Sequence, residues 1–482
     1  MRALHSVAEV RAAEAALMAR LPEGALMQRA AAGLARRCAQ LLGQVYGSPV
    51  VLLVGGGDNG GDALYAGARL AGRGARVHAL LTGEKAHPGG LAALRRAGGR
   101  IGGDAAQLLV GADLVVDGVL GIGGRGGLRE PAASWASAVA SGRADVVAVD
   151  IPSGVDADSG RVDGVAVRAD VTVTFGTRKP GLVVSPGASY AGIVECVDIG
   201  LELPDARLTM LDAQDVAARI PQADAGSNKY RRGVVGIVAG SETYTGAAVL
   251  ATGGALRSGA GMVRYVGPPH PAEVVRHRWP EAVVTVTEEG ADPTVAGQVQ
   301  AWVVGPGLGT GEAAENVVAA VLRTDVPVLV DADGLTVLSR HREWLVGRSA
   351  PTLLTPHAGE FARLMRTERA TVEADQLAWV TRAAAELGVT VLLKGAATLV
   401  ADPSGRVRVN PTGTPWLATA GSGDVLSGGA GALLAGGLSP LDAGSCGAFL
   451  HGLAGQLAAG PGVSIVAADL VAQWPAAVAA LR

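Results

Sequence analysis

Short runs of Val, Ile and Leu recur along the chain, and Ala-rich stretches that suit helices lie between them. The runs are continuous rather than alternating with polar residues, as strands covered on both faces require. Their spacing suits β-α-β units, in which a helix connects two parallel strands. In the first half they lie at residues 50–54, 77–81, 114–116, 146–149 and 171–175. This half is therefore predicted to be an open, mostly parallel sheet between layers of helices.

The second half repeats this style with different glycine and proline positions. Its runs lie at residues 234–239, 262–266, 302–304, 326–331, 352–355, 389–394 and 406–410. The sequence shows no repeat of fixed period, which indicates two different α/β domains rather than a duplication. A chain of 482 residues is also too long for one ordinary core.

The join between the domains is expected between Glu202 and Lys229. This stretch is polar, carries Pro204 and Pro221, and has no strand signal. We place the boundary near Pro221, which gives domains of residues 1–215 and 222–482.

Composition narrows the class of protein. Apolar residues make up 49% and charged residues 18%, which fits compact globular domains, and the net charge of -3 gives no sign of nucleic acid or an anionic membrane as a partner. Cys38, Cys196 and Cys446 are isolated, which argues against a disulfide framework or a zinc site and favours a reducing compartment. The charged N-terminus does not resemble a signal peptide, and no run approaches the roughly 20 apolar residues of a membrane span. We expect a soluble, cytoplasmic protein.

A glycine-rich segment, GGGDNGGD at residues 55–62, follows the first apolar run directly and precedes an Ala-rich stretch. Glycines let the backbone approach a ligand closely, and the start of a helix attracts phosphate. Gly55, Gly57 and Gly60 also satisfy the dinucleotide pattern GxGxxG. The acidic residue expected about 20 positions later has only Glu84 as a late candidate. A tight strand-to-helix turn without a ligand therefore stays open as an alternative.

Two further polar segments follow later apolar runs: DGVLGIGGRGG at residues 117–127 and VDIPSGVD at residues 149–156. A single Asp in such a place usually caps the end of a strand. Three polar segments at successive strand ends of one sheet converge in space, which indicates a binding site.

These three segments resemble the signature segments of the NAD(P)H-hydrate epimerase family, and the resemblance covers most of residues 1–215. It implies a Rossmann-like, three-layer α/β domain and a potassium ion held by Asn59, Asp117 and Ser153, which is reasonable because hard cations prefer oxygen donors. Asp150 is our candidate for proton transfer. The sequence departs from the family at Asp58, usually Asn, and at Ala63, usually Gly; the extra charge at Asp58 would weaken the binding of a phosphorylated substrate. The implied substrate contacts are Asp58, Asn59, Gly60, Gly61, Asp62, Gly121, Ile122, Gly123, Gly124, Arg125, Gly126, Gly127 and Asp150.

The second half contains TAGSGDVLSGG at residues 419–429, followed by an apolar, helix-like run. Gly421 and Gly423 permit a tight backbone around an anion at the start of a helix. Asp424 can accept a proton from a hydroxyl that is about to be phosphorylated. A helix cap would explain Asp424 but not the glycines on both sides of it. The pattern resembles the GxGD segment of ribokinase-like small-molecule kinases.

Six more segments resemble the ADP- or ATP-dependent NAD(P)H-hydrate dehydratase family, in order, over residues 225–482. They are YRRG (230–233), GS with YTGA (240–247), GPGLG (305–309), DADG (331–334), TPHAGE (355–360) and KGAAT (394–398). The resemblance implies a ribokinase-like α/β domain that uses Mg²⁺ with ADP or ATP. Implied substrate contacts are Ala247, Gly307, His357 and Asp424, and implied nucleotide contacts are Lys394, Gly395, Ala396, Ala397, Thr398 and Gly423.

Some of these residues have structural alternatives. His357 could be a helix-capping histidine, and Lys394 an exposed lysine at a strand end. Thr414, Trp416 and Ala420 also replace the Asn, Gly and Gly that the dehydratase family usually has before GSGD.

Together the two resemblances predict a bifunctional repair enzyme. Its first domain would interconvert the R and S forms of hydrated NADH and NADPH. Its second would dehydrate the S form at the expense of ADP or ATP, giving AMP or ADP and phosphate. We expect small-molecule substrates, no nucleic-acid or membrane partner, and a homo-oligomer. The alternatives are a ribokinase-like kinase with a regulatory domain, a non-catalytic sensor of nicotinamide nucleotides, and a dehydrogenase.

Overall fold

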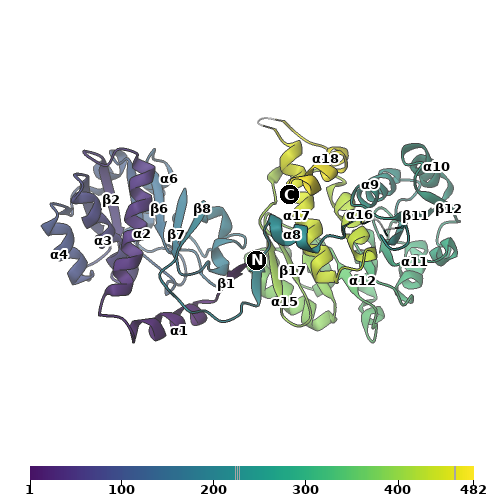
Figure 1. Ribbon diagram of the computed structural model, residues 1–482, viewed down its shortest axis with the longest axis horizontal. Coiled ribbons are helices and arrows are strands. Elements are labelled where there is room, and N and C mark those ends of the chain that lie inside the picture. Colours follow the sequence, from purple (N-terminus) through teal and green to yellow (C-terminus); the bar gives the residue numbers. More distant parts are fainter. Residues whose placement is uncertain (223, 225, 227, 461–462, 482) are drawn as a thin grey trace. The chain divides into compact units, whose positions relative to one another are not determined.

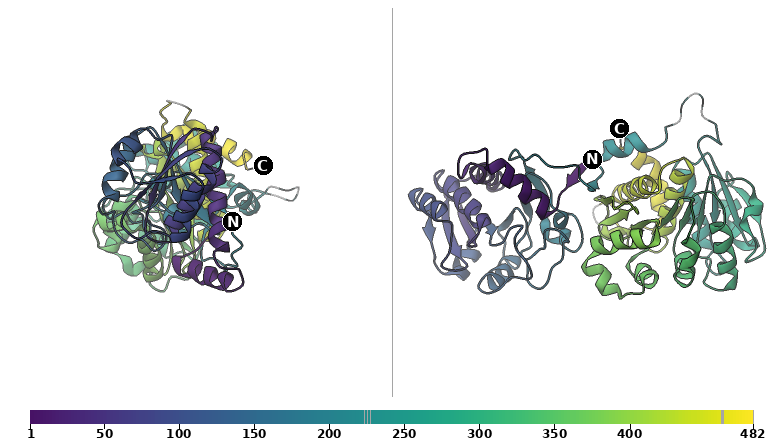
Figure 2. Two further views of the ribbon diagram at one scale, coloured as in Figure 1. Left: turned by 90° about the vertical axis from the view of Figure 1, so that its left-hand side faces the viewer. Right: turned by 90° about the horizontal axis from the view of Figure 1, so that it is seen from below.

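The computed structural model describes residues 1–222, 224, 226, 228–460 and 463–481 (Figures 1 and 2). It divides the chain into two compact units. The first unit is Ala3–Ala206, and the second is Met1–Arg2 together with Arg207–Arg482. Within the described residues, no helix combines the length and the apolarity that a bilayer crossing requires.

The first unit contains a parallel sheet with the strand order β4-β3-β2-β5-β6-β7-β8. Each predicted run forms a strand. The strands are β2 (Pro49–Val54), β3 (Arg76–Leu81), β4 (Arg100–Ile101), β5 (Leu114–Gly118), β6 (Asp145–Val149), β7 (Val171–Phe175) and β8 (Ile193–Val197). The helices are α1 (Val7–Met18), α2 (Ala25–Leu42), α3 (Asp58–Ala71), α4 (Pro88–Arg96), α5 (Ala105–Val110), α6 (Ala132–Ala140) and α7 (Ala188–Ala191).

Strand β2 shows why its sequence is apolar at every position. Val50, Leu52 and Val54 join one buried cluster, together with residues of α2 and α3. Val51 and Leu53 point the other way and join a second buried cluster, together with residues of α5 and α6. Helices cover both faces of the sheet, so successive residues of a central strand are all buried. This confirms the predicted three-layer α/β architecture.

The second unit contains a sheet with the order β1-β9-β18-β17-β16-β15-β14-β13-β10-β11-β12. Its neighbours from β9 to β12 pair in parallel, except that β17 is antiparallel to both β16 and β18. The strands are β1 (Arg2–Leu4), β9 (Leu208–Met210), β10 (Val234–Val238), β11 (Met262–Gly267), β12 (Val283–Val286), β13 (Ala301–Val304), β14 (Val328–Val330), β15 (Thr352–Leu354), β16 (Thr390–Leu393), β17 (Thr398–Ala401) and β18 (Val407–Asn410).

Helices join and cover these strands. They are α8 (Ala213–Arg219), α9 (Thr245–Arg257), α10 (Pro269–Arg278), α11 (Glu312–Leu322), α12 (Asp333–Arg340), α13 (Ala358–Met365), α14 (Arg369–Ala374), α15 (Gln376–Leu387), α16 (Ser422–Ala435), α17 (Pro440–Ala458) and α18 (Ala467–Ala479). Helices α9, α16, α17 and α18 share one large apolar cluster, in which Trp474 is fully buried. The GSGD segment forms the start of α16. The packing of α16 in this cluster therefore fixes the position of that segment.

The division between the units lies inside the stretch 202–229 expected for the join, but earlier than the boundary placed near Pro221. It falls between Ala206 and Arg207, so residues 207–215, predicted to be part of the first domain, belong to the second unit. The expectation that the stretch 202–229 holds no strand is also wrong, because Leu208, Thr209 and Met210 pair in parallel with β18. A strand of three residues is too short to show a pattern of its own, and its partner lies far along the sequence.

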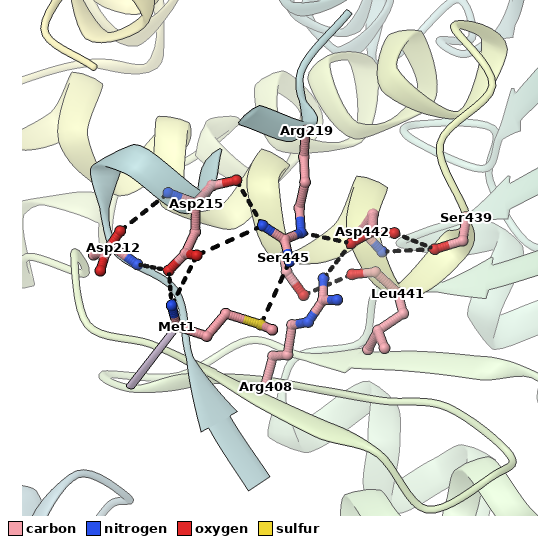
Figure 3. Close-up of polar contacts among 9 residues, drawn as sticks. All are labelled: Met1, Asp212, Asp215, Arg219, Arg408, Ser439, Leu441, Asp442 and Ser445. Atoms are coloured by element: carbon pink, nitrogen blue, oxygen red, sulfur yellow. Dashed lines mark hydrogen bonds and ion pairs between the residues drawn. The ribbon is translucent and has the colours of Figure 1, made fainter. Parts of the chain in front are cut away.

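Helix α8 is held to the second unit by a network of charges, which Figure 3 shows. Arg219 Nε lies 3.2 Å from Asp442 Oδ1 on α17, and Arg408 Nη1 on β18 lies 2.5 Å from the same oxygen. The amino group of Met1 donates to Asp215 Oδ1 at 2.8 Å. These contacts, together with the buried Val216, place the residues after the junction on the second sheet.

Candidate active sites

The first candidate site lies where strands β2, β5 and β6 end. Residues 55–62 follow β2 directly, residues 117–127 begin within the last residues of β5, and residues 149–156 begin at the last residue of β6. β2 pairs with β5, and β5 pairs with β6, so these ends are neighbours. β3 lies on the other side of β2, which makes the β2–β5 boundary a topological switch point, where open α/β sheets bind ligands. The structure therefore brings the three predicted segments together.

Asn59 connects these segments. It lies in the first turn of α3, and its Nδ2 donates hydrogen bonds to Leu120 O at 3.0 Å and to Val149 O at 2.6 Å. A Cβ atom on Gly121 would lie only 2.4 Å from Asn59 Oδ1, so glycine at 121 permits the close approach of the loop. The amide thus fixes how the loop after β5 lies against the start of α3.

Asp117 and Ser153 form the deepest part of this site. The Ser153 hydroxyl donates to Asp117 Oδ1 at 2.6 Å, and the Ser153 amide donates to Oδ2 at 2.8 Å. Burial raises the pKa of Asp117 to about 6, against the opposing effect of the Ser153 hydrogen bonds. Both Asn59 Nδ2 and Ser153 Oγ lie within hydrogen-bond distance of Leu120 O. The predicted potassium ligands are therefore neighbours.

This group fits a hard monovalent cation. Asp117 is fully buried, and among the described residues no ion pair compensates its charge. The side chains of Asn59, Asp117 and Ser153 carry an amide, a carboxylate and a hydroxyl oxygen, the kind of ligand that such cations prefer. The described residues contain no cluster of three or more His, Cys, Asp or Glu side chains able to hold a metal ion, so a site of the transition-metal kind is not found there.

Several glycines of the first site are required by packing. A Cβ on Gly55 would lie 1.9 Å from Val119 O, and one on Gly60 would lie 2.1 Å from Gly55 O. A Cβ on Gly61 would meet Met27 at 2.9 Å. The alternative of a tight strand-to-helix turn therefore explains the small size of these residues without a ligand.

The loop after β5 has both half-buried and exposed members. Ile122 packs on a small apolar cluster, and a Cβ on Gly123 would lie 2.9 Å from Arg11 Nη2. Gly124 donates its amide to Gly121 O at 2.8 Å, whereas Arg125 is exposed. Gly126 has a left-handed φ of 72°, and a Cβ on Gly127 would lie 2.3 Å from Asp163 O.

Asp150 follows β6 with a left-handed φ of 65°, which is uncommon for a residue other than glycine. Its Oδ1 accepts hydrogen bonds from Lys179 Nζ at 2.5 Å, Thr174 Oγ1 at 3.0 Å and the Phe175 amide at 3.2 Å. Such backbone conformations often lie at functional sites, where the surroundings enforce them. Lys179 was not among the predicted residues.

Other carboxyl groups surround Asp150. Burial, followed by the charges of Asp150 and Asp58, raises the pKa of Asp62 well above its usual range, and Asp62 Oδ1 is buried without a hydrogen-bond partner in the part of the chain that the structure describes. Burial, followed by the charge of Asp150, also raises the pKa of Glu14 on α1. The first site is therefore crowded with acidic groups, and α1 contributes to it.

The second candidate site lies where strands β10, β13, β14, β15 and β16 end. A Cβ on Gly307 would lie 2.8 Å from Ala247 Cβ, and the Gly240 amide donates to Pro306 O at 2.7 Å. His357 forms a parallel bridge with Lys394. A Cβ on Gly423 would lie 3.3 Å from Lys394 Nζ, which brings the GSGD and KGAAT segments together. The rest of KGAAT, Gly395, Ala396, Ala397 and Thr398, continues from Lys394 into the start of β17.

Asp424 lies in the first turn of α16. The N-cap of this helix is Gly421, with a φ of 83°, and none of the described side chains makes a capping hydrogen bond there, so the helix-cap alternative for Asp424 is wrong. Burial, followed by the charge of Asp331, raises the pKa of Asp424 from 3.8 to about 7. A carboxyl group of this kind can take up and release a proton near neutral pH.

Lys394 is paired rather than exposed. Its Nζ lies 2.8 Å from Asp331 Oδ1 and 3.8 Å from Glu360 Oε2. Burial alone would lower the pKa of Lys394, but these two carboxylates outweigh it and raise the pKa. Ser427 donates to Asp331 Oδ2 at 2.6 Å, which links this pair to α16.

His357 is a helix cap. Its Nδ1 accepts the Gly359 amide at 2.9 Å, and the Glu360 carboxylate accepts the His357 amide at 2.9 Å, which completes a capping box at the start of α13. The TPHAGE segment favoured a functional interpretation of His357. The cap accounts for this residue without a ligand, so its contact with substrate stays a prediction.

Comparison with known proteins decides the family. The family model described as NAD(P)H-hydrate dehydratase matches residues 235–475, and the one described as YjeF-related protein N-terminus matches residues 23–181. The bifunctional NAD(P)H-hydrate repair enzyme of Mycobacterium tuberculosis is 49% identical over 425 residues, which cover 87% of this chain and 86% of that protein. The chain belongs to the family of bifunctional NAD(P)H-hydrate repair enzymes. Another repair enzyme of this family, from Moorella thermoacetica, is 36% identical over 452 residues, which cover 86% of this chain and 84% of that protein.

Solved structures resemble the dehydratase part of this repair-enzyme chain. The ADP/ATP-dependent NAD(P)H-hydrate dehydratase of Bacillus subtilis, co-crystallised with ATP and Mg²⁺, has a TM-score of 0.52 and 29% identity, and the match covers 57% of this chain and 99% of that one. A ribokinase-like superfamily protein of Enterococcus faecalis has a TM-score of 0.52 and 27% identity, with coverages of 58% and 98%. The predicted ribokinase-like fold is confirmed.

Sequence reasoning missed several residues of these repair-enzyme sites: Arg11, Glu14, Lys179, Asp331 and Glu360. Asp331 and Glu360 belong to the segments DADG and TPHAGE, which follow predicted strands directly. Their place after a strand could have indicated a role in the site. Arg11 and Glu14 lie in α1, whose charged residues are spaced as on an ordinary surface helix. Nothing in the sequence indicated that they belong to the site.

Proposed function

We propose that the first unit interconverts the R and S forms of hydrated NADH and NADPH, and that the second unit dehydrates the S form. The second reaction would consume ADP or ATP and give AMP or ADP and phosphate. Membership in the repair-enzyme family, over both parts of the chain, is the observation that carries this proposal.

The chemistry of the damaged ring supports two active sites. Hydration places a hydroxyl on the carbon beside the ring nitrogen, whose lone pair stabilises a cation at that carbon. When the C–O bond breaks, the hydroxyl takes a proton and leaves as water; water then adds to either face and gives a proton back. We assign this proton transfer to Asp150, whose side chain is only 8% exposed to water. The substrate contacts proposed for the first site are the predicted residues of 58–62 and 121–127.

A potassium ion held by Asn59, Asp117 and Ser153 forms part of the proposal. The buried carboxylate of Asp117, which has no ion-pair partner among the described residues, supports it. When bound, the ion would supply a fixed positive charge beside a phosphorylated substrate.

In the second site, Asp424 would take the proton of the substrate hydroxyl while that oxygen attacks the terminal phosphorus of the nucleotide. The phosphorus–oxygen bond to AMP or ADP breaks in the same step. Phosphate then leaves the ring carbon with its bonding electrons, and loss of a proton from the neighbouring carbon restores the dihydropyridine. Mg²⁺ would offset the charge of the nucleotide phosphates, as its presence with ATP in the Bacillus subtilis crystals suggests. Lys394, Gly395, Ala396, Ala397, Thr398 and Gly423 are the proposed nucleotide contacts, and Ala247, Gly307, His357 and Asp424 the proposed substrate contacts.

The test is incubation of the purified protein with a mixture of both hydrate epimers, an adenine nucleotide, Mg²⁺ and K⁺, with recovery of the reduced cofactor followed by its absorbance. Complete conversion requires both activities, whereas the second alone stops once the S form is consumed. A stable phosphorylated product without recovery of NADH would indicate a kinase and contradict the proposal. No reaction of the hydrates would contradict it as well.

A further inference from the structure

A buried lysine adjoins the group to which we assign proton transfer. The Lys179 side chain is 1% exposed, and that of its partner Asp150 is 8% exposed. A lysine is almost never fully buried unless it is paired. Of the two side chains, that of Asp150 is therefore the one accessible from the site.

The three N–H bonds of the Lys179 ammonium all have acceptors. Nζ lies 2.5 Å from Asp150 Oδ1, 3.0 Å from Thr174 Oγ1 and 3.0 Å from Phe175 O. An ammonium group has three donors and no acceptor. Lys179 thus has no free donor for a substrate atom, and it acts on Asp150.

The hydrogen bonds to Asp150 are one-sided. Oδ1 accepts from Lys179, from Thr174 Oγ1 and from the Phe175 amide, whereas in the described part of the chain Oδ2 accepts no hydrogen bond. The Asp150 amide also donates to Val173 O at 2.8 Å, which anchors the residue in its left-handed conformation. The carboxyl group is therefore held at one oxygen, and the other is left to the site.

The position of Lys179 is itself fixed. It precedes a short 3-10 helix at Pro180–Leu182, and a Cβ on Gly181 would lie 2.2 Å from Asp156 O, so the chain here is packed against the segment that begins with Asp150. Burial and the charge of Asp150 raise the pKa of Glu14, and the Lys179 ammonium acts against both.

We propose that Lys179 is a positioning residue of the first site, which holds Asp150 Oδ1 so that Oδ2 exchanges the proton with the substrate. This inference rests on the proposed epimerase function. Because the ammonium touches neither substrate nor reacting atoms, its loss is expected to slow the proton transfer more than it weakens substrate binding.

The experiment measures epimerisation of a single purified hydrate epimer in the full-length protein. Nucleotide is omitted, so that the second site is silent, and the epimers are separated by chromatography after subtraction of the spontaneous rate. The variant Lys179→Met keeps the length of the side chain and removes its charge. The matched control is Arg178→Met, which removes the neighbouring positive charge, whose guanidinium contacts Val194 O rather than Asp150.

We expect Lys179→Met to lower kcat about 100-fold while KM changes less than about threefold, since small misplacements of a catalytic group have effects of this size. Arg178→Met should keep kcat within about threefold of the wild type. A kcat for Lys179→Met equal to that of the control would overturn the proposal. So would a raised KM with unchanged kcat, because Lys179 would then be a binding residue.

Thr174→Val covers the case in which Lys179→Met does not fold. It is nearly isosteric and removes one hydrogen bond to Oδ1. We expect kcat to fall about tenfold, in line with a hydrogen bond to a charged group. An unchanged kcat would overturn the proposal. A wild-type protein without epimerase activity would instead contradict the proposed function, so the two failures are distinguishable.

Discussion

The buried carboxyl group of Asp424 predicts how the dehydratase rate depends on pH. Burial and the charge of Asp331 raise its pKa from 3.8 to about 7. A general base works only when it is deprotonated, so the rate should rise with pH and level off above pH 7. For a single group of pKa about 7, the active fraction is about one tenth at pH 6 and about one hundredth at pH 5.

The measurement is kcat/KM for the S hydrate between pH 5 and pH 8.5 at fixed nucleotide and Mg²⁺ concentrations. The variant Asp424→Asn should lose about 10² to 10⁴ in rate, the usual range for a general base. The residual rate of this variant should not rise with pH around pH 7, as the wild-type rate does. This variant is the control for other ionising groups, including the nucleotide phosphates.

A second variant tests the cause of the shift. Asp331 raises the pKa of Asp424, and it also pairs with Lys394, whose charge lowers that pKa. Asp331→Asn removes the first effect and leaves Glu360 as the ion-pair partner of the Lys394 ammonium. Both changes move the midpoint of the pH–rate profile to lower pH. A wild-type rate that is flat from pH 5 to pH 8, or a midpoint that rises in Asp331→Asn, would refute this reasoning.

Three further predictions concern other parts of the molecule. Gly60→Ala places a Cβ 2.1 Å from Gly55 O, so we expect a loss of at least about 2 kcal/mol of stability and of epimerase activity, measured by denaturant unfolding and by the epimer assay; wild-type stability would contradict the close packing of this turn. Asp442→Asn should cost about 1–2 kcal/mol at pH 7. Its hydrogen bonds to Arg408 and Ser439 outweigh burial and lower the pKa of Asp442. The difference from wild type should therefore shrink as the pH falls through that lowered pKa, and a difference that grows in acid would be inconsistent. Finally, epimerisation should be faster in K⁺ than in Na⁺, and Asp117→Asn should abolish the preference; equal rates of the wild type in both ions would argue against the cation site.

Local sequence patterns were enough to predict the α/β architecture of both units. The central strands of each sheet are buried on both faces, so their apolar runs are visible without knowledge of their neighbours, as for residues 50–54. Glycines at strand ends were visible too, and parallel strands bring their carboxyl ends to one edge. The segments around Asn59, Asp117 and Asp150 could therefore be expected to meet.

Individual roles were harder to predict, because a side chain's role depends on its contacts. His357 was expected to be functional, and its Nδ1 caps α13. Lys394 stood in the quoted KGAAT segment, but its ion pair with Asp331 depends on two different strands. The strand β9 has only three residues, and its partner β18 lies about two hundred residues later in the chain, so the junction near Arg207 was placed too late.

The amino-acid sequence by itself determined two α/β domains in order, their parallel strands and the segments that line their sites, because burial on both faces and turns at strand ends leave local patterns. Tertiary structure alone decided which charges meet: Lys179 with Asp150, Asp331 with Lys394, and Glu14 of α1 near the first site. Electrostatic and hydrogen-bond energies depend on distances of a few ångströms between residues that are separated in the chain. Such distances exist only once the fold has formed.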